Sequence, residues 1–275
     1  MSKLVMANVM RLQKNMCFWI GFVFMAAAGI FFPVRGYVEM CRTGMKSLIE
    51  NGFFSCSLFA SIIMAVFCSL FTGTGYSDGT IRNKVVIGHK RMDIYVADMI
   101  TSSVVGVVMC IGFFLPYLCI GIPLLGDFTI ESKTVLLIGV TVLLLVAAFT
   151  SIFTLVAMIC QNKAVVAVVC LLLAFGLLLV GSLLNSRLQA PKTIPVYTMS
   201  ENNEPVAAEE PNPQYLEGTE REIVQTFYDV LPGGQAVQCT SLEVVHLPRL
   251  PLYSILIILS TTGIGLFCFQ KKDLK

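Results

Sequence analysis

Charged side chains are scarce in this chain. Only 13% of its 275 residues are Asp, Glu, Lys or Arg, whereas 56% are hydrophobic. A soluble domain usually carries about 25% charged residues, so too few are present here to cover a surface that faces water. This composition excludes an ordinary soluble globular protein.

The charges are almost absent from six long apolar runs. These cover residues 16–34, 52–75, 94–122, 134–160, 164–184 and 252–269. None contains Lys or Arg, and the only acid in them is Asp98, near one end of the third. About 20 apolar residues cross a bilayer as a helix, and within lipid a helix satisfies its own backbone hydrogen bonds. We therefore predict an all-α integral membrane protein with six transmembrane helices.

The third run is longer than one crossing requires. Pro116 and Pro123 interrupt its second half. Proline removes a hydrogen bond from a helix and clashes with the preceding turn. We predict a spanning helix to about Tyr117, followed by a kinked or re-entrant piece.

Basic residues are distributed unevenly between the segments that separate the runs. If the N-terminus is cytoplasmic, eleven of the 19 basic residues and only four of the 17 acids lie in cytoplasmic segments. The positive-inside rule favours this orientation over its inverse. We predict that both termini are cytoplasmic.

The segments outside the runs complete the expected organisation. Four parts are predicted: a cytoplasmic interfacial helix at 1–15, transmembrane helices one to five at 16–184 with a cytoplasmic loop at 76–93, an extracellular domain at 185–251, and the sixth helix with a basic tail at 252–275. The interfacial helix follows from apolar residues at helical spacing with basic residues between them. A frayed tail whose charges only set the topology is the alternative.

The extracellular domain has two halves of different composition. The first, up to Gly218, is rich in proline and glutamate and is predicted to be extended or mobile. In the second, residues 220–231 form a predicted amphipathic helix that Pro232, Gly233 and Gly234 end. Its apolar face lies on the outer membrane surface or on a partner subunit. That face consists of Ile223, Val224, Phe227 and Leu231.

Eight of the ten cysteines fall in the apolar runs, and only Cys41 and Cys239 lie in outer segments. The two could form a disulfide, although their spacing does not require it.

Groups that carry catalysis or proton transport are missing from the membrane. The middles of the six runs contain no acid, base or histidine, and His89 and His246 lie outside them. Proton-coupled pumps and intramembrane hydrolases usually need such groups at that depth. The glycine-rich stretch 73–80 lacks the Lys-Ser or Lys-Thr pair of a phosphate-binding loop. We predict that the chain is not an enzyme, holds no metal or cofactor, binds no nucleic acid and depends on another protein for energy.

The cytoplasmic loop 76–93 has the pattern of a docking element. Ser77 or Asp78 can cap a short helix, and Gly88 can end it. Ile81 and Val85 then share one face at i and i+4, between basic residues. We expect this face to be exposed to the cytosol and to enter a groove on a partner. A basic turn that only sets the topology, with Ile81 and Val85 resting on lipid, is equally compatible with the pattern.

Residues 76–90 read YSDGTIRNKVVIGHK and resemble the loop after the second span of bacterial ABC-2 type permeases. The family often has an LPxGQ-like stretch before its last span, similar to LPGGQ at 231–235, and a short basic tail like KKDLK at 271–275. The resemblance implies a bacterial plasma-membrane permease that pairs with a second permease chain, as a homodimer or a heterodimer. It also implies a separate cytoplasmic ABC ATPase that binds ATP and magnesium.

The resemblance and the residue pattern together predict roles for particular residues. ATPase coupling falls to Asp78, Thr80, Ile81, Arg82, Lys84, Val85, His89, Lys90 and Arg91. An extracellular gate is expected at Phe227, Leu231, Pro232 and Gly233. A cargo path is expected along Phe53, Phe54, Phe59, Met64 and Phe67.

The expected cargo is an amphipathic peptide, such as an antimicrobial peptide or a peptide toxin, because adaptable Met and Phe side chains suit varied amphipathic molecules. Lipids, drugs and sodium are alternative cargoes. A different class also fits: a membrane protein that senses an extracellular peptide without transporting it.

Overall fold

The computed structural model describes residues 1–199 and 205–272, with the backbone alone at 196–199 and 205–208. The helices are α1 (Ser2–Gln13), α2 (Met16–Thr43), α3 (Glu50–Phe53), α4 (Cys56–Ser77), α5 (Thr80–Val86), α6 (Arg91–Leu125), α7 (Ser132–Ile159), α8 (Lys163–Leu188), α9 (Gly218–Val230), α10 (Pro232–Ser241) and α11 (Arg249–Lys271). Strands β1 (Thr193–Met199) and β2 (Pro205–Pro211) form an antiparallel hairpin.

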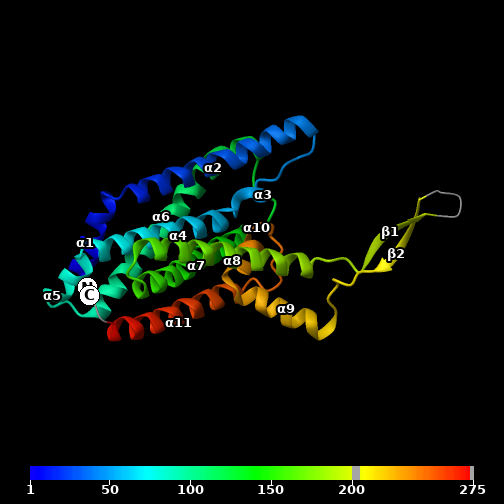
Figure 1. The fold of residues 1–275 in the computed structure, drawn as a ribbon. Helices are drawn as coiled ribbons and strands as arrows, with labels where there is room; N and C mark the ends of the chain where they lie inside the picture. The colour runs from blue at the N-terminus through cyan, green and yellow to red at the C-terminus, as the bar shows by residue number, and fades with distance from the viewer. Residues whose placement is uncertain (200–204, 273–275) are drawn as a thin grey trace.

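Within the described residues, six helices are long and apolar enough to cross a membrane, consistent with a multi-pass membrane protein. They are α2, α4 with the preceding α3, α6, α7, α8 and α11. The prediction of six apolar spans in a helical fold is confirmed. The six run along one axis in an elongated bundle (Figure 1). We call the end with α1, α5 and the last turn of α11 the terminal end, and the end with α3, α9 and α10 the distal end.

The helix α4 is the centre of the bundle. Within its apolar window 67% of residues are buried, against 17% in α11 and 28% in α2. Stacked pairs of aromatic rings fill the interior, Phe67 with Phe71 on α4 and Phe149 with Phe153 on α7. The outer helices expose apolar side chains, an arrangement that is favourable where lipid replaces water.

The third span differs from its prediction. α6 continues without interruption to Leu125, and both Pro116 and Pro123 lie inside it. A re-entrant piece after Tyr117 was therefore the wrong expectation, whereas a kink at the prolines stays a prediction. Spanning helices tolerate proline because neighbouring groups and small local adjustments compensate for the lost hydrogen bond.

The proline-rich segment expected to be extended or mobile forms the β-hairpin, which projects beyond the distal end (Figure 1). The Asn212 amide donates to the Lys192 carbonyl at 2.9 Å, which fixes the alternation of hydrogen-bonded pairs along the ladder. Pro195, Pro205 and Pro211 all fall in the non-hydrogen-bonded pairs. Their backbone nitrogens therefore point away from the partner strand, toward the outer edges of the hairpin. The ladder therefore loses no donor, and both edges become poor templates for a further strand.

Candidate functional site

A buried acid lies at the terminal end of the bundle. Asp98 of α6 is only 4% exposed, and one carboxylate oxygen accepts a 2.7 Å hydrogen bond from the Thr72 hydroxyl on α4. The other oxygen accepts a 3.4 Å bond from the side-chain amide of Asn8 on α1. Three helices that are distant in sequence therefore meet at one carboxylate.

Two basic side chains surround this acid. The oxygen of the Asn8 amide accepts a 2.9 Å hydrogen bond from Lys84 on α5, so Asn8 bridges Lys84 and Asp98. Arg11 donates to the Phe71 carbonyl, and its guanidinium carbon lies 4.1 Å from the centre of the Phe71 ring. Burial lowers the pKa of Arg11 and of Lys84, whereas the Asp98 carboxylate opposes that shift. Asp98 thus stabilises two charges that burial disfavours.

We call these residues the Asp98 cluster: Asn8, Arg11, Thr72, Lys84 and Asp98. Sequence analysis identified Lys84 as a coupling residue and Asp98 as the only acid within an apolar run. It missed Asn8, Arg11 and Thr72. The available signal was Asp98 itself, since an acid within a span needs a partner.

An apolar layer surrounds the cluster. Leu4 of α1, Ile81 of α5, Tyr95 of α6 and Phe269 of α11 belong to one buried group of side chains. The helix predicted at residues 1–15 is therefore present as α1, and Leu4 and Asn8 pack it against the bundle. Its predicted place on the inner leaflet stays a prediction.

Basic side chains also cap two spans at this end. Lys272 donates to the carbonyls of Met158 and Ile159 at the end of α7, and the Tyr76 hydroxyl donates to Met158 at 2.7 Å. Arg91 donates to the carbonyls of Gln270 and Lys272 at the end of α11. The final carbonyls of a helix lack partners within the helix, and cations near them are favourable.

The short helix expected in the 76–93 loop is present as α5, but its faces are reversed. Ile81 is only 4% exposed, and Val85 packs against the same buried group. The prediction that Ile81 and Val85 are exposed to the cytosol is therefore wrong. The reason is that α1 and α6, which the loop sequence does not contain, cover this face.

Capping of α5 also differs from prediction. Gly79 occupies the N-cap in the left-handed conformation, with φ of 68°, so neither Ser77 nor Asp78 caps the helix through its side chain. The Thr80 hydroxyl instead donates to the Gly75 carbonyl at 2.9 Å and attaches α5 to the end of α4. Asp78 is exposed at the C-terminal cap of α4.

The exposed apolar residues lie at the C-terminal end of α5 and directly after it. Val86 is 77% exposed and Ile87 76%. Arg82 and Lys90 are exposed beside them, and His89 is half-buried. We call Arg82, Val86, Ile87 and Lys90 the α5 tip. The tip combines apolar and basic side chains, as the sequence predicted, but its apolar residues are Val86 and Ile87 rather than Ile81 and Val85.

A second feature occupies the distal end. Pro232, Gly233 and Gly234 were predicted to end a helix; α9 does end at Val230, but Pro232 then begins α10. Proline suits the first position of a helix, where no intrahelical donor is needed. Gly233, Gln235, Ala236 and Cys239 are buried, so α10 is enclosed between α4, α7 and α8. Sequence analysis missed this helix.

Glycines permit the enclosure of α10. A Cβ at Gly233 would lie 1.8 Å from the Leu177 carbonyl oxygen of α8, and one at Gly181 of α8 would lie 2.5 Å from the Gly233 backbone. Only glycine permits such an approach of two backbones. The α10 helix thus closes the distal end of the bundle.

Polar contacts attach α9 and α10 to their surroundings. Asp229 is buried and accepts hydrogen bonds from Gln225 at 2.7 Å and Gln238 at 3.1 Å. His246, on the segment that precedes α11, lies 3.0 Å from its second oxygen. The Ser254 hydroxyl of α11 donates to Gln235 at 2.7 Å.

The predicted gate residues occupy different environments. Pro232 and Gly233 are buried in the α9–α10 junction, and Leu231 is half-buried. Phe227 is 67% exposed and Ile223 52%, whereas Val224 packs against the buried group of Leu188, Leu216 and Tyr228. Only the part of the apolar face formed by Ile223 and Phe227 is therefore free of this chain. Whether it lies on a membrane or on a partner stays a prediction.

The predicted cargo path is packed interior. Phe54, Met64 and Phe67 are at most 1% exposed, and Phe59 is half-buried. The Phe53 ring contacts four others, those of Phe54, Phe114, Tyr117 and Phe128. These five side chains therefore line no open path within one chain.

The possible disulfide is not formed. Cys239 is buried in α10, whereas Cys41 is exposed on α2, and both are free thiols. Within the described residues, no group of three or more His, Cys, Asp or Glu could hold a metal ion.

No model of a known protein family matches the chain, and no curated protein matches it.

Proposed function

We propose that this protein is the membrane subunit of an ATP-driven exporter in a bacterial plasma membrane, with both termini in the cytoplasm. The observation that carries the proposal is the continuity between the α5 tip and the Asp98 cluster. Val86 and Ile87 present an apolar surface beside Arg82 and Lys90, while Lys84 on the same helix is hydrogen-bonded into the cluster. A push on α5 is therefore transmitted to α1, α4 and α6.

The partner is a separate cytoplasmic ABC ATPase, which binds ATP and magnesium. The resemblance of residues 76–90 to ABC-2 type permeases supports this choice. The α5 tip docks in a groove of the ATPase, and closure of the ATPase around ATP moves α5 together with the spans that the Asp98 cluster joins.

The cargo path lies between two copies of the chain or between this chain and a related one. Support comes from the packed interior around α3 and α4, because Phe54, Met64 and Phe67 are buried and leave no room for a path inside a single chain. The enclosed α10 and the exposed Phe227 face of α9 form the extracellular gate of that path. The cargo is an amphipathic peptide, for which the exposed apolar face of α9 is suited.

The test is a double substitution at the α5 tip, Val86→Asp with Ile87→Asp, in the full chain co-expressed with the ABC ATPase encoded beside it. We expect the permease to fold and insert normally, because both side chains are exposed, and to lose co-purification and stimulation of the ATPase. Val245→Asp is the matched control, since Val245 is 66% exposed at the distal end. Normal stimulation by the double variant, or no ABC ATPase beside the gene, would contradict the proposal.

A further inference from the structure

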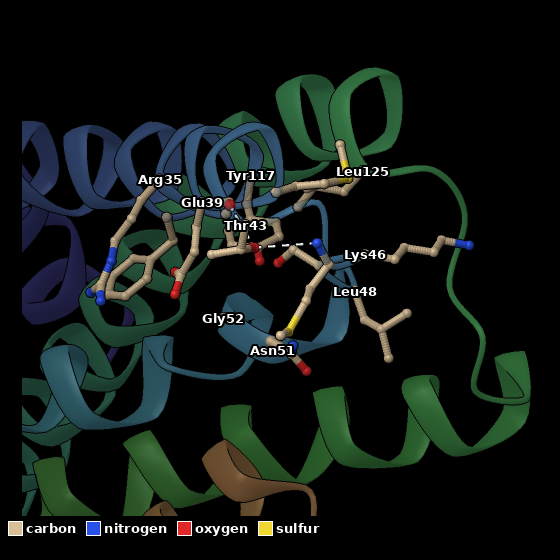
Figure 2. A pocket seen from close by; sticks show the side chains of 14 residues that line it. Arg35, Glu39, Thr43, Lys46, Leu48, Asn51, Gly52, Tyr117 and Leu125 are labelled. Carbon is tan, nitrogen blue, oxygen red and sulfur yellow. Dashed lines mark hydrogen bonds between the residues drawn. The ribbon is translucent and has the colours of Figure 1, made fainter.

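A pocket of about 390 Å³ opens at the distal end between the last turns of α2, the segment that follows them and the end of α6. Its wall is apolar at Phe32, Tyr117 and Leu125. Arg35 and Glu39 of α2 bring opposite charges to the same pocket (Figure 2). A volume of this size admits a small amphiphilic molecule.

The depth of the pocket follows from the sequence of α2. The apolar run 16–34 is about 28 Å long as a helix, close to the thickness of a hydrocarbon core, and Arg35 directly follows it. Arg187 and Arg249 likewise lie just outside the distal ends of the apolar runs 164–184 and 252–269. The apolar wall thus lies at the hydrocarbon boundary and the charges at the level of the lipid headgroups.

Arg35 and Glu39 are one helical turn apart but do not pair. Among the described residues, Lys192 pairs with Glu217 and the His246 ring lies 3.0 Å from Asp229, whereas Arg35 and Glu39 form no ion pair. In Figure 2 the Arg35 and Glu39 side chains lie beside each other on α2, whereas Lys46 extends away from them. A basic residue four positions before an acidic one is the less favourable order for a helical pair. Both charges are therefore available to a ligand that carries both signs.

We propose that this pocket binds the headgroup of phosphatidylethanolamine. The phosphate accepts hydrogen bonds from the Arg35 guanidinium, and the primary ammonium group donates to the Glu39 carboxylate. The acyl chains lie along the adjacent apolar face of α2, where Phe31 and Val34 are exposed. Lipid binding here needs no ATPase and no cargo, so this inference stands apart from the proposed export function.

The test uses the full chain in nanodiscs of equimolar phosphatidylethanolamine and phosphatidylglycerol, followed by detergent extraction and native mass spectrometry of the retained lipid. We expect the wild type to retain phosphatidylethanolamine in preference. Arg35→Gln should lower retention of both lipids about tenfold, the effect of losing one charge-assisted hydrogen bond. Glu39→Gln should abolish the preference, because phosphatidylglycerol carries a phosphate but no ammonium group.

Two further variants keep the test decisive. Arg187→Gln is the control, because Arg187 is exposed at the distal end of α8 and lines no pocket with Arg35 or Glu39. Gly36→Leu should fill the pocket, since even a Cβ there would meet Ser47 Oγ at 3.1 Å and Leu125 at 3.6 Å. The proposal is overturned if Arg35→Gln retains as much lipid as Arg187→Gln, if the wild type shows no preference, or if Gly36→Leu keeps the preference.

Discussion

The hydroxyl of Thr72 on α4 lies 2.7 Å from the buried carboxylate of Asp98 on α6 and donates a hydrogen bond to it. This contact joins two spans directly, and Asn8 extends it to α1 and, through Lys84, to α5. The carboxylate also opposes the effect of burial on the pKa of Lys84. We therefore expect the stability of the terminal end to depend on this one charge.

Asp98→Asn tests this dependence. The amide can still accept from Thr72, but the negative charge that favours protonated Lys84 and Arg11 is lost. We expect the free energy of unfolding to fall by about 1.5–3 kcal/mol, the range for hydrogen bonds to charged groups. Hydrogen exchange should become faster in α1 and α5. Asp93→Asn, in the first turn of the same helix, is the control, and equal effects of the two variants would show that Asp98 has no special role.

The six spans could be predicted from sequence because the membrane imposes length and composition on each of them. The Asp98 cluster could not, since Asn8 and Asp98 are 90 positions apart and no local pattern relates them. The same limit explains α5: helical spacing correctly placed Ile81 and Val85 on one face, but only the packing of α1 and α6 decides that this face is buried. Pro232, Gly233 and Gly234 were ambiguous for a local reason, because the sequence that ends α9 also starts α10.

Ile81→Asp and Val86→Asp should separate folding from coupling. Ile81 of α5 is buried against α1 and α6. A carboxylate at this position would lose its water without gaining a partner, so we expect loss of the folded permease. Val86 is exposed, and its aspartate variant should reach the membrane at the wild-type level. The measurement is the amount of monodisperse protein after extraction. Wild-type yield of Ile81→Asp would show that α5 is not packed as described.

Cys41 and Cys239 offer a test of orientation. Burial raises the pKa of the Cys239 thiol to about 12, so its reactive thiolate is rare at neutral pH. Cys41 is exposed at the distal end of α2. A membrane-impermeant maleimide should therefore label Cys41 in right-side-out vesicles, and Cys41→Ser should remove this labelling. Labelling only in inverted vesicles would contradict the proposed orientation, and labelling only after reduction would indicate a disulfide.

Excision of the β-hairpin should leave the rest of the protein folded. Lys192 and Asn212 lie at its base, joined by a 2.9 Å backbone hydrogen bond, so a short Gly-Ser linker can connect them in place of residues 193–211. The hairpin projects beyond the bundle (Figure 1), and its loss removes no part of the core. We expect an unchanged melting temperature and unchanged export of cargo. Loss of export at normal stability would show that the hairpin itself takes part in transport.

Gly233→Ala should disrupt the closure of the distal end. The new methyl group would lie 1.8 Å from the Leu177 carbonyl oxygen, and a backbone atom cannot rotate away as a side chain can, so α10 has to move from α8. Overpacking of a core costs about 1–3 kcal/mol, and a clash with backbone belongs at the upper end of that range. Gly176→Ala is the matched control on α8, because nothing lies within 4 Å of a Cβ there. We expect only Gly233→Ala to lower the melting temperature and to make Cys239 of α10 reactive to maleimide. If Cys239 stays protected and the melting temperature is unchanged, α10 does not close the bundle in the way that its contacts indicate.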